Sequence, residues 1–80
     1  MKTELTEDQI KYLEKTFVYH APFGDQVGRY QLLRDTAKAF AFQILTEVPW
    51  SREASLALTS LEQAVFWANA AIARNEVEEK

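Results

Sequence analysis

Residues 49–76, PWSREASLALTSLEQAVFWANAAIARNE, carry the clearest helical pattern in this 80-residue chain. Ser51 is a favoured helix N-cap residue, and Glu53 in the first turn suits the positive end of the helix dipole. Apolar residues then recur at steps of four, three, four, three and four, as one helix face requires: Ala54, Leu58, Leu61, Val65, Ala68 and Ile72. The stretch is predicted to form one long helix.

A second segment, from residue 26 to about residue 47, carries a matching stripe. Its apolar positions recur at steps of three and four: Tyr30, Leu33, Ala37, Phe40 and Ile44. Pro49 ends this helix, because the residue before a proline avoids the helical backbone region. Two long helices joined by a few residues must lie antiparallel. The sequence therefore predicts an all-α fold built on a helical hairpin whose two stripes interlock.

A short helix is predicted before the hairpin. Thr6 and Gln9 have the spacing of a capping box, and Ile10, Leu13 and Phe17 give one apolar stripe. Pro22 and Gly24 then break the helical pattern, and Asp25 is predicted to be the N-cap of the first hairpin helix. The acidic tail, residues 76–80, is expected to fray.

Length and composition bound the class of protein. Residues 1–80 are expected to form a single domain, and a chain this short often needs disulfides, a metal or oligomerisation for stability. It has no cysteine, and its one histidine cannot form a metal cluster, so oligomerisation is the remaining route. A net charge of −3 argues against binding to DNA or RNA polymers. No segment approaches a membrane span or a signal peptide, so a cytoplasmic location is expected.

Both long helices carry apolar residues outside their stripes. These would stay in water in an isolated hairpin, and the short first helix can cover only part of them: Phe42, Leu45, Leu56, Phe66, Trp67, Ala70 and Ala71. Such a patch exceeds what soluble monomers usually expose. Self-association into a homo-oligomeric helical bundle is therefore predicted.

Signatures of catalysis are missing from the sequence. His20 has no serine or cysteine near it in sequence, and each carboxylate is explained as a cap or a solvated helix face. With two glycines there is no glycine-rich phosphate loop. We expect no enzyme, no catalytic residue, no metal and no cofactor.

The linker before the hairpin allows two interpretations. Tyr19 and Phe23 can stack on nucleobases while Arg34 and Lys38, four residues apart on one helix face, bind phosphate. Alternatively, the two aromatic residues pack the short helix onto the hairpin, and the arginines at 29 and 34 pair with the aspartates at 25 and 35. Residues of the last helix also have structural interpretations. Asn69 can fix the register of the helix pair, and the charge of Arg74 suits the negative end of the helix dipole.

Two segments carry a resemblance to a known family. The linker YHAPFGDQVGRY, residues 19–30, with Arg34 after it, and residues 49–76 are similar to the phage anti-CBASS family of cyclic-oligonucleotide sponges. The hairpin of this family is shared with the phage sponges that block Thoeris signalling. The resemblance covers about residues 17–76. It implies a homohexamer that sequesters the cyclic nucleotides of bacterial CBASS defence, such as cyclic GMP–AMP, without cleaving them.

The resemblance also implies two sets of binding residues. For cyclic dinucleotides, held between protomers around the linker, the matching positions are Tyr19, His20, Pro22, Gly24, Arg34 and Lys38. For cyclic trinucleotides, held in separate pockets lined by the last helix, they are Thr59, Asn69, Ala70, Ala73 and Arg74.

Three alternatives remain at this point. A sponge for cyclic ADP-ribose derivatives of Thoeris signalling is the nearest, although such proteins usually carry sequence beyond the hairpin. A structural helical bundle without a small ligand is the second. A helix-turn-helix DNA reader is the third, and the abrupt reversal at Pro49 and the lack of a basic recognition face count against it.

Overall fold

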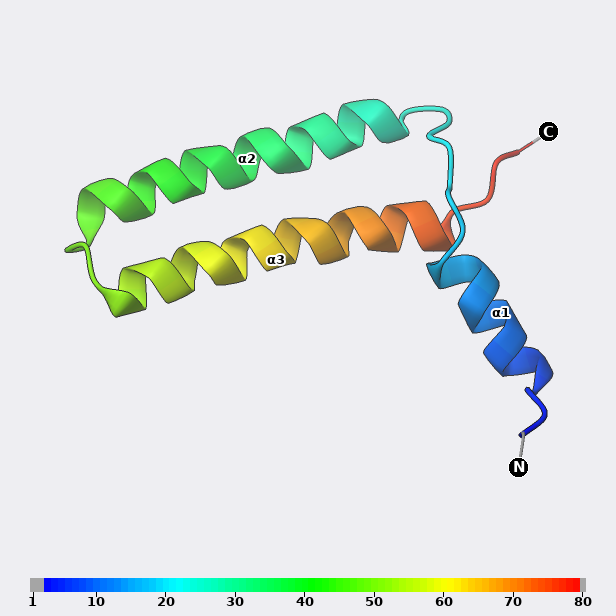
Figure 1. Ribbon diagram of the computed structural model, residues 1–80. Coiled ribbons are helices and arrows are strands. Elements are labelled where there is room, and N and C mark those ends of the chain that lie inside the picture. The colour runs from blue at the N-terminus through cyan, green and yellow to red at the C-terminus, as the bar shows by residue number, and fades with distance from the viewer. Residues whose placement is uncertain (1–2, 80) are drawn as a thin grey trace.

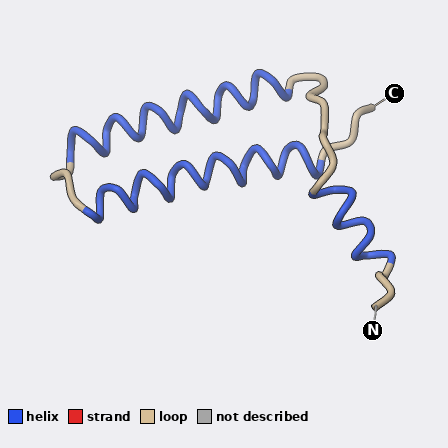
Figure 2. Tube along the Cα trace, viewed as in Figure 1, coloured by secondary structure: helices blue, strands red, loops and turns tan. Residues whose placement is uncertain are grey.

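A computed structural model describes residues 3–79 and contains three helices. Helix α1 spans Glu7–Thr16, α2 spans Gln26–Glu47 and α3 spans Arg52–Asn75 (Figure 1). Every regular element within these residues is helical (Figure 2). The predicted all-α fold, a short first helix followed by a long hairpin, is confirmed.

The helix ends agree with two of the three predicted caps. At α1, Thr6 accepts a hydrogen bond from the amide of Gln9, whose side chain accepts one from the Thr6 amide, so the capping box is complete. At α3, Ser51 Oγ accepts from the Ala54 amide at 3.1 Å. The predicted side-chain cap at Asp25 is wrong. Its backbone, at φ −88° and ψ 8°, is not extended as an N-cap requires, and its carboxylate binds Arg29 instead.

Helices α2 and α3 run antiparallel and are the one pair in extensive contact within the described residues (Figure 1). Val48 leaves the helical conformation before Pro49, at ψ 150°, as predicted. Ala54 is buried, and the other predicted stripe residues are half-buried except one. That exception is Phe40, which is 53% exposed, because a pair of helices covers its seam from one side only.

Helix α1 projects away from the hairpin beside the C-terminal end of α3 (Figure 1). Its predicted apolar stripe stays exposed, at 45% for Ile10, 40% for Leu13 and 74% for Phe17. Phe17 makes an edge-on contact with Tyr12, at 6.2 Å between ring centroids. The short helix therefore leaves the apolar surface of the hairpin uncovered in a single chain.

The single chain is far from compact. Its radius of gyration is 17.5 Å, against about 12 Å for a packed domain of this length. Its accessible surface is 7027 Å², against about 4,900 Å² for a folded monomer of 9.2 kDa. The excess, about 2,100 Å², comes from the open hairpin together with the projecting α1 and the extended tail. Among the described helices, none is both long enough and apolar enough to cross a membrane.

Candidate functional site

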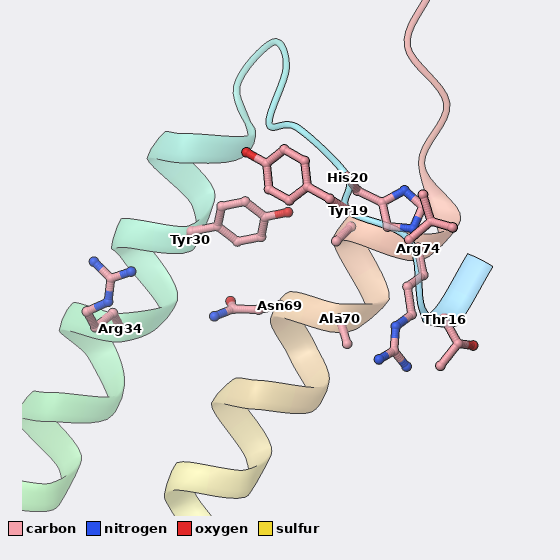
Figure 3. A pocket seen from close by; sticks show the side chains of 10 residues that line it. Thr16, Tyr19, His20, Tyr30, Arg34, Asn69, Ala70 and Arg74 are labelled. Carbon is pink, nitrogen blue, oxygen red and sulfur yellow. The ribbon is translucent and has the colours of Figure 1, made fainter. Parts of the chain in front are cut away.

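An open depression of about 430 Å³ lies between the loop after α1, the first turns of α2 and the last turns of α3. Figure 3 shows aromatic rings and guanidinium groups around it. Ten residues line it: Thr16, Val18, Tyr19, His20, Tyr30, Arg34, Asn69, Ala70, Ala73 and Arg74.

The loop that forms one wall, residues 17–25, is shaped at both ends. At its start, His20 Nε2 donates to the carbonyl oxygen of Lys15 at 2.7 Å. At its end, Gly24 adopts a φ of +56°, which a residue with a side chain rarely adopts, and this turns the chain into α2. Tyr19, directly before His20, is 82% exposed. The interpretation that Tyr19 packs α1 onto the hairpin is therefore wrong for the single chain, and its ring is available to a ligand.

Of the arginines near the depression, Arg29 is committed to carboxylates. Its Nε donates to Asp25 Oδ1 at 3.1 Å, and both terminal nitrogens donate to the carboxylate of Glu76. These bonds raise the pKa of Arg29 and lower the pKa of Glu76 to about 2. The predicted pairing of Arg29 with Asp25 is confirmed. The tail leaves the helix at Glu76 and has no regular structure over residues 77–79, in line with the expected fraying, and Lys80 lies outside the described residues. The Glu76 side chain is nevertheless held by Arg29.

The other two arginines have no ion pair within residues 3–79. Arg34 Nη1 donates to Gln31 Oε1 at 3.1 Å, while Gln31 Nε2 donates to Asp35 at 2.8 Å. The predicted pairing of Arg34 with Asp35 is therefore wrong, because Gln31 lies between them. Arg34 and Arg74 both line the depression, and neither forms an ion pair with a carboxylate among residues 3–79. An anion is the ligand that such a pair favours.

Asn69 presents an acceptor with no partner in the part of the chain described. Its side chain comes from α3 and lies between Arg34 and Arg74 (Figure 3), and its Oδ1 is buried without a hydrogen bond. An unpaired buried acceptor costs about 1–3 kcal/mol, so a donor from outside the single chain would stabilise it. Asn69 makes no hydrogen bond to α2, so it does not fix the helix register in this chain.

The depression gathers seven of the eleven sequence-predicted binding residues. From the dinucleotide set these are Tyr19, His20 and Arg34, and from the trinucleotide set Asn69, Ala70, Ala73 and Arg74. Lys38 lines an adjoining groove along the hairpin, which Arg34 and Asn69 also border. Gly24 borders a different hollow beside Phe23 and Glu76. Pro22 and Thr59 line none of these three.

Sequence reasoning missed the second role of Tyr30. It assigned this tyrosine to the hairpin seam, where it is indeed half-buried, but the same ring also faces the depression opposite Tyr19 (Figure 3). The signal was present, since Tyr30 precedes Arg34 by four residues and so shares its helix face. No group of three or more metal-ligating side chains is gathered within the described residues.

Comparison with known families identifies the chain. The family model "Acb2/Tad1, hairpin domain" matches residues 8–73, so the matched region includes all of α2 and most of α1 and α3. Neither the curated proteins nor the solved structures gave a match. Because the matched residues cover most of the chain and include nine of the ten residues that line the depression, this protein belongs to the Acb2/Tad1 hairpin-domain family, and membership implies a cyclic-nucleotide sponge, a class that is generally non-catalytic.

Proposed function

We propose that this protein binds cyclic dinucleotides such as cyclic GMP–AMP, and cyclic trinucleotides, and sequesters them without cleavage. As a phage-encoded protein, it would thereby block activation of CBASS effectors in the infected bacterium. The observation that carries the proposal is the depression itself, in which two aromatic rings stand beside two arginines that have no described carboxylate partner.

The lining matches the chemistry of a cyclic oligonucleotide. Each base offers a flat face, and stacking on an aromatic ring is worth about 1–3 kcal/mol per base. Each phosphate carries a negative charge that a guanidinium binds in two-pronged fashion. Tyr19 and Tyr30 supply the rings, and Arg34 and Arg74 supply the cations. An acidic chain can bind such an anion because both of these cations line the same depression.

The two ligand classes would use different sides of the depression. On the loop side, Tyr19, His20 and Arg34 would hold a dinucleotide, with Pro22 and Gly24 shaping the loop and Lys38 extending the positive charge along α2. On the α3 side, Arg74 would hold phosphates of a trinucleotide. The remaining members of that set would line the pocket: Thr59, Asn69, Ala70 and Ala73.

Assembly would complete the site. In one chain the depression is open, and the excess surface of about 2,100 Å² equals the share that a protomer gives to two or three standard interfaces of about 800 Å² each. A homohexamer, which the family resemblance implies, gives each hairpin such neighbours. Symmetry would then set a second copy's rings and cations against the same cyclic ligand.

Sequestration without turnover is consistent with the state of His20. Its Nε2 is used by the Lys15 carbonyl, and no carboxylate is hydrogen-bonded to the ring among the described residues. With Nε2 donating, the basic lone pair is on Nδ1, but within residues 3–79 the ring has no carboxylate partner of the kind that orients a catalytic histidine. His20 is therefore proposed to shape the wall of the pocket and not to activate water.

Isothermal titration with cyclic GMP–AMP, with a cyclic trinucleotide and with a cyclic ADP-ribose isomer tests the choice of ligand. We expect tight binding of the first, and heat denaturation of the complex should release it intact. Binding of the cyclic ADP-ribose isomer alone would reassign the protein to Thoeris signals. Recovery of linear fragments would contradict sequestration, and no effect of any of these ligands on the melting temperature would favour a purely structural bundle.

A further inference from the structure

A hydrogen-bond network joins three segments beside the depression. Its centre is Gln26, which is 2% exposed and is the one buried polar side chain among residues 3–79. Gln26 Oε1 accepts from the amide of Phe23 in the loop at 3.1 Å, and Nε2 donates to Glu76 Oε1 at 3.1 Å. One side chain at the start of α2 thus ties the loop to the residue that follows α3.

Arg29 closes the network one turn further along α2. Its guanidinium donates to both oxygens of Glu76, with Nη1 to Oε2 at 2.7 Å, while its Nε reaches Asp25. A planar guanidinium fits a carboxylate in this forked geometry, whereas an ammonium group does not. These partners lie 47 and 50 residues apart in sequence, so the contacts hold the two ends of the hairpin unit together.

We propose that Gln26, Arg29 and Glu76 are positioning residues, which hold the loop carrying Tyr19 against the end of α3 in the conformation that accepts the ligand. The inference rests on the proposed function of the depression. Tyr19 itself is 82% exposed, so packing within the chain does not fix its ring. Within the described residues, this network supplies the hydrogen bonds between the loop side of the depression and the end of α3.

The proposal makes a prediction opposite in sign to simple electrostatics. Glu76 is negative and lies two residues beyond Arg74, so its charge opposes the binding of a phosphate anion. Removing that charge should raise affinity if charge alone mattered, more so because Arg29 would be released. If the network positions the loop, removal should lower affinity, because the binding-competent fraction of the protein falls and the apparent dissociation constant rises in proportion.

The test compares Glu76→Gln with Glu79→Gln, a matched charge change in the same tail at a residue outside the network. Titration with cyclic GMP–AMP should show about tenfold weaker binding for Glu76→Gln, as expected if the ordered fraction falls to about a tenth. Glu79→Gln should bind as well as the parent or slightly better. Equal gains in both variants would overturn the proposal.

Arg29→Lys gives a second arm in which the charge stays the same. Electrostatics predicts unchanged affinity, whereas loss of the forked geometry predicts weaker binding. Unchanged affinity together with unchanged exchange of the Phe23 amide would overturn the proposal.

Amide hydrogen exchange separates this inference from the proposed function. The Phe23 amide should lose protection in Glu76→Gln and Arg29→Lys, while amides in the middle of α2 and α3 keep theirs, which shows that the fold is intact. Failure of the parent protein to bind any cyclic nucleotide would refute the proposed function. Hydrogen exchange of the Phe23 amide would still test whether the network orders the loop. Retained protection of this amide in both variants would refute the positioning role.

Discussion

Trp67 on the outer face of α3 gives the sharpest test of assembly. It is 68% exposed in the single chain and has the exposed Phe66 next to it. If the excess surface of the hairpin is covered by other copies, replacing this ring by a small polar side chain should weaken the assembly. We therefore consider Trp67→Ser, with Gln63→Ser, an exposed polar residue of the same helix, as the matched control.

The magnitude follows from the exposed area. A tryptophan can bury about 150–250 Å², so the exposed 68% corresponds to roughly 100–170 Å² available for an interface. At about 25 cal/mol per Å², covering that area stabilises the assembly by about 2.5–4 kcal/mol per side chain. The dissociation constant of one contact should then rise roughly a hundred- to a thousandfold.

Sedimentation velocity over a range of micromolar concentrations measures this effect. The parent chain and Gln63→Ser should sediment as one oligomer, and Trp67→Ser should show smaller species at concentrations where the parent remains assembled. Circular dichroism checks that helix content is retained in the variant. A parent chain that sediments at 9.2 kDa throughout the range would refute the reasoning from surface area, and so would a Trp67→Ser variant that assembles as tightly as the parent.

Tyr19→Ala should weaken binding of cyclic GMP–AMP by about ten- to a hundredfold in a titration, the equivalent of one stacking contact, and a smaller change would show that the ring does not stack on a base. Arg74→Ala should impair trinucleotide binding and spare dinucleotides, whereas equal losses for both ligands would argue for a single shared site. Ser51→Ala should lower the free energy of unfolding by about 1 kcal/mol in urea at fixed protein concentration, because the Ala54 amide loses its cap; the control is Ser60→Ala, and equal effects of the two would contradict the capping role. The parent should have a larger free energy of unfolding than Glu76→Gln above about pH 4.5, and this difference should disappear as the pH falls through about 2, because folding lowers the pKa of the Glu76 carboxyl. A difference that persists below about pH 2 would contradict the ion pair as its cause.

Much of the fold was readable from local chemistry. The predicted capping box at Thr6 and N-cap at Ser51 were correct because each depends on residues three positions apart. The predicted end of α2 before Pro49 was correct because proline restricts the backbone of its immediate neighbour. The seam was correct because helical spacing alone determines which residues share a face. Asp25 was wrong as a cap because its carboxylate had a competing partner one turn along, Arg29.

The site was readable only in part. The family resemblance named residues for two ligands, and the structure brings seven of them to one depression, but their roles stay predictions. That Arg29 is committed to Glu76, while Arg34 and Arg74 have no described carboxylate partner, depends on contacts between the two ends of the hairpin. Spacing within one helix cannot show such a contact.

Local sequence patterns were sufficient for the three helices, the reversal at Pro49 and the stripe that joins α2 to α3, because each follows from interactions within a few residues. Contacts between distant segments set which cations face the depression, leave Tyr19 exposed and bind the Glu76 side chain beyond the end of α3. Those outcomes depend on where the end of α3 meets the loop and the start of α2, and such a meeting of distant segments is set by packing across the whole hairpin.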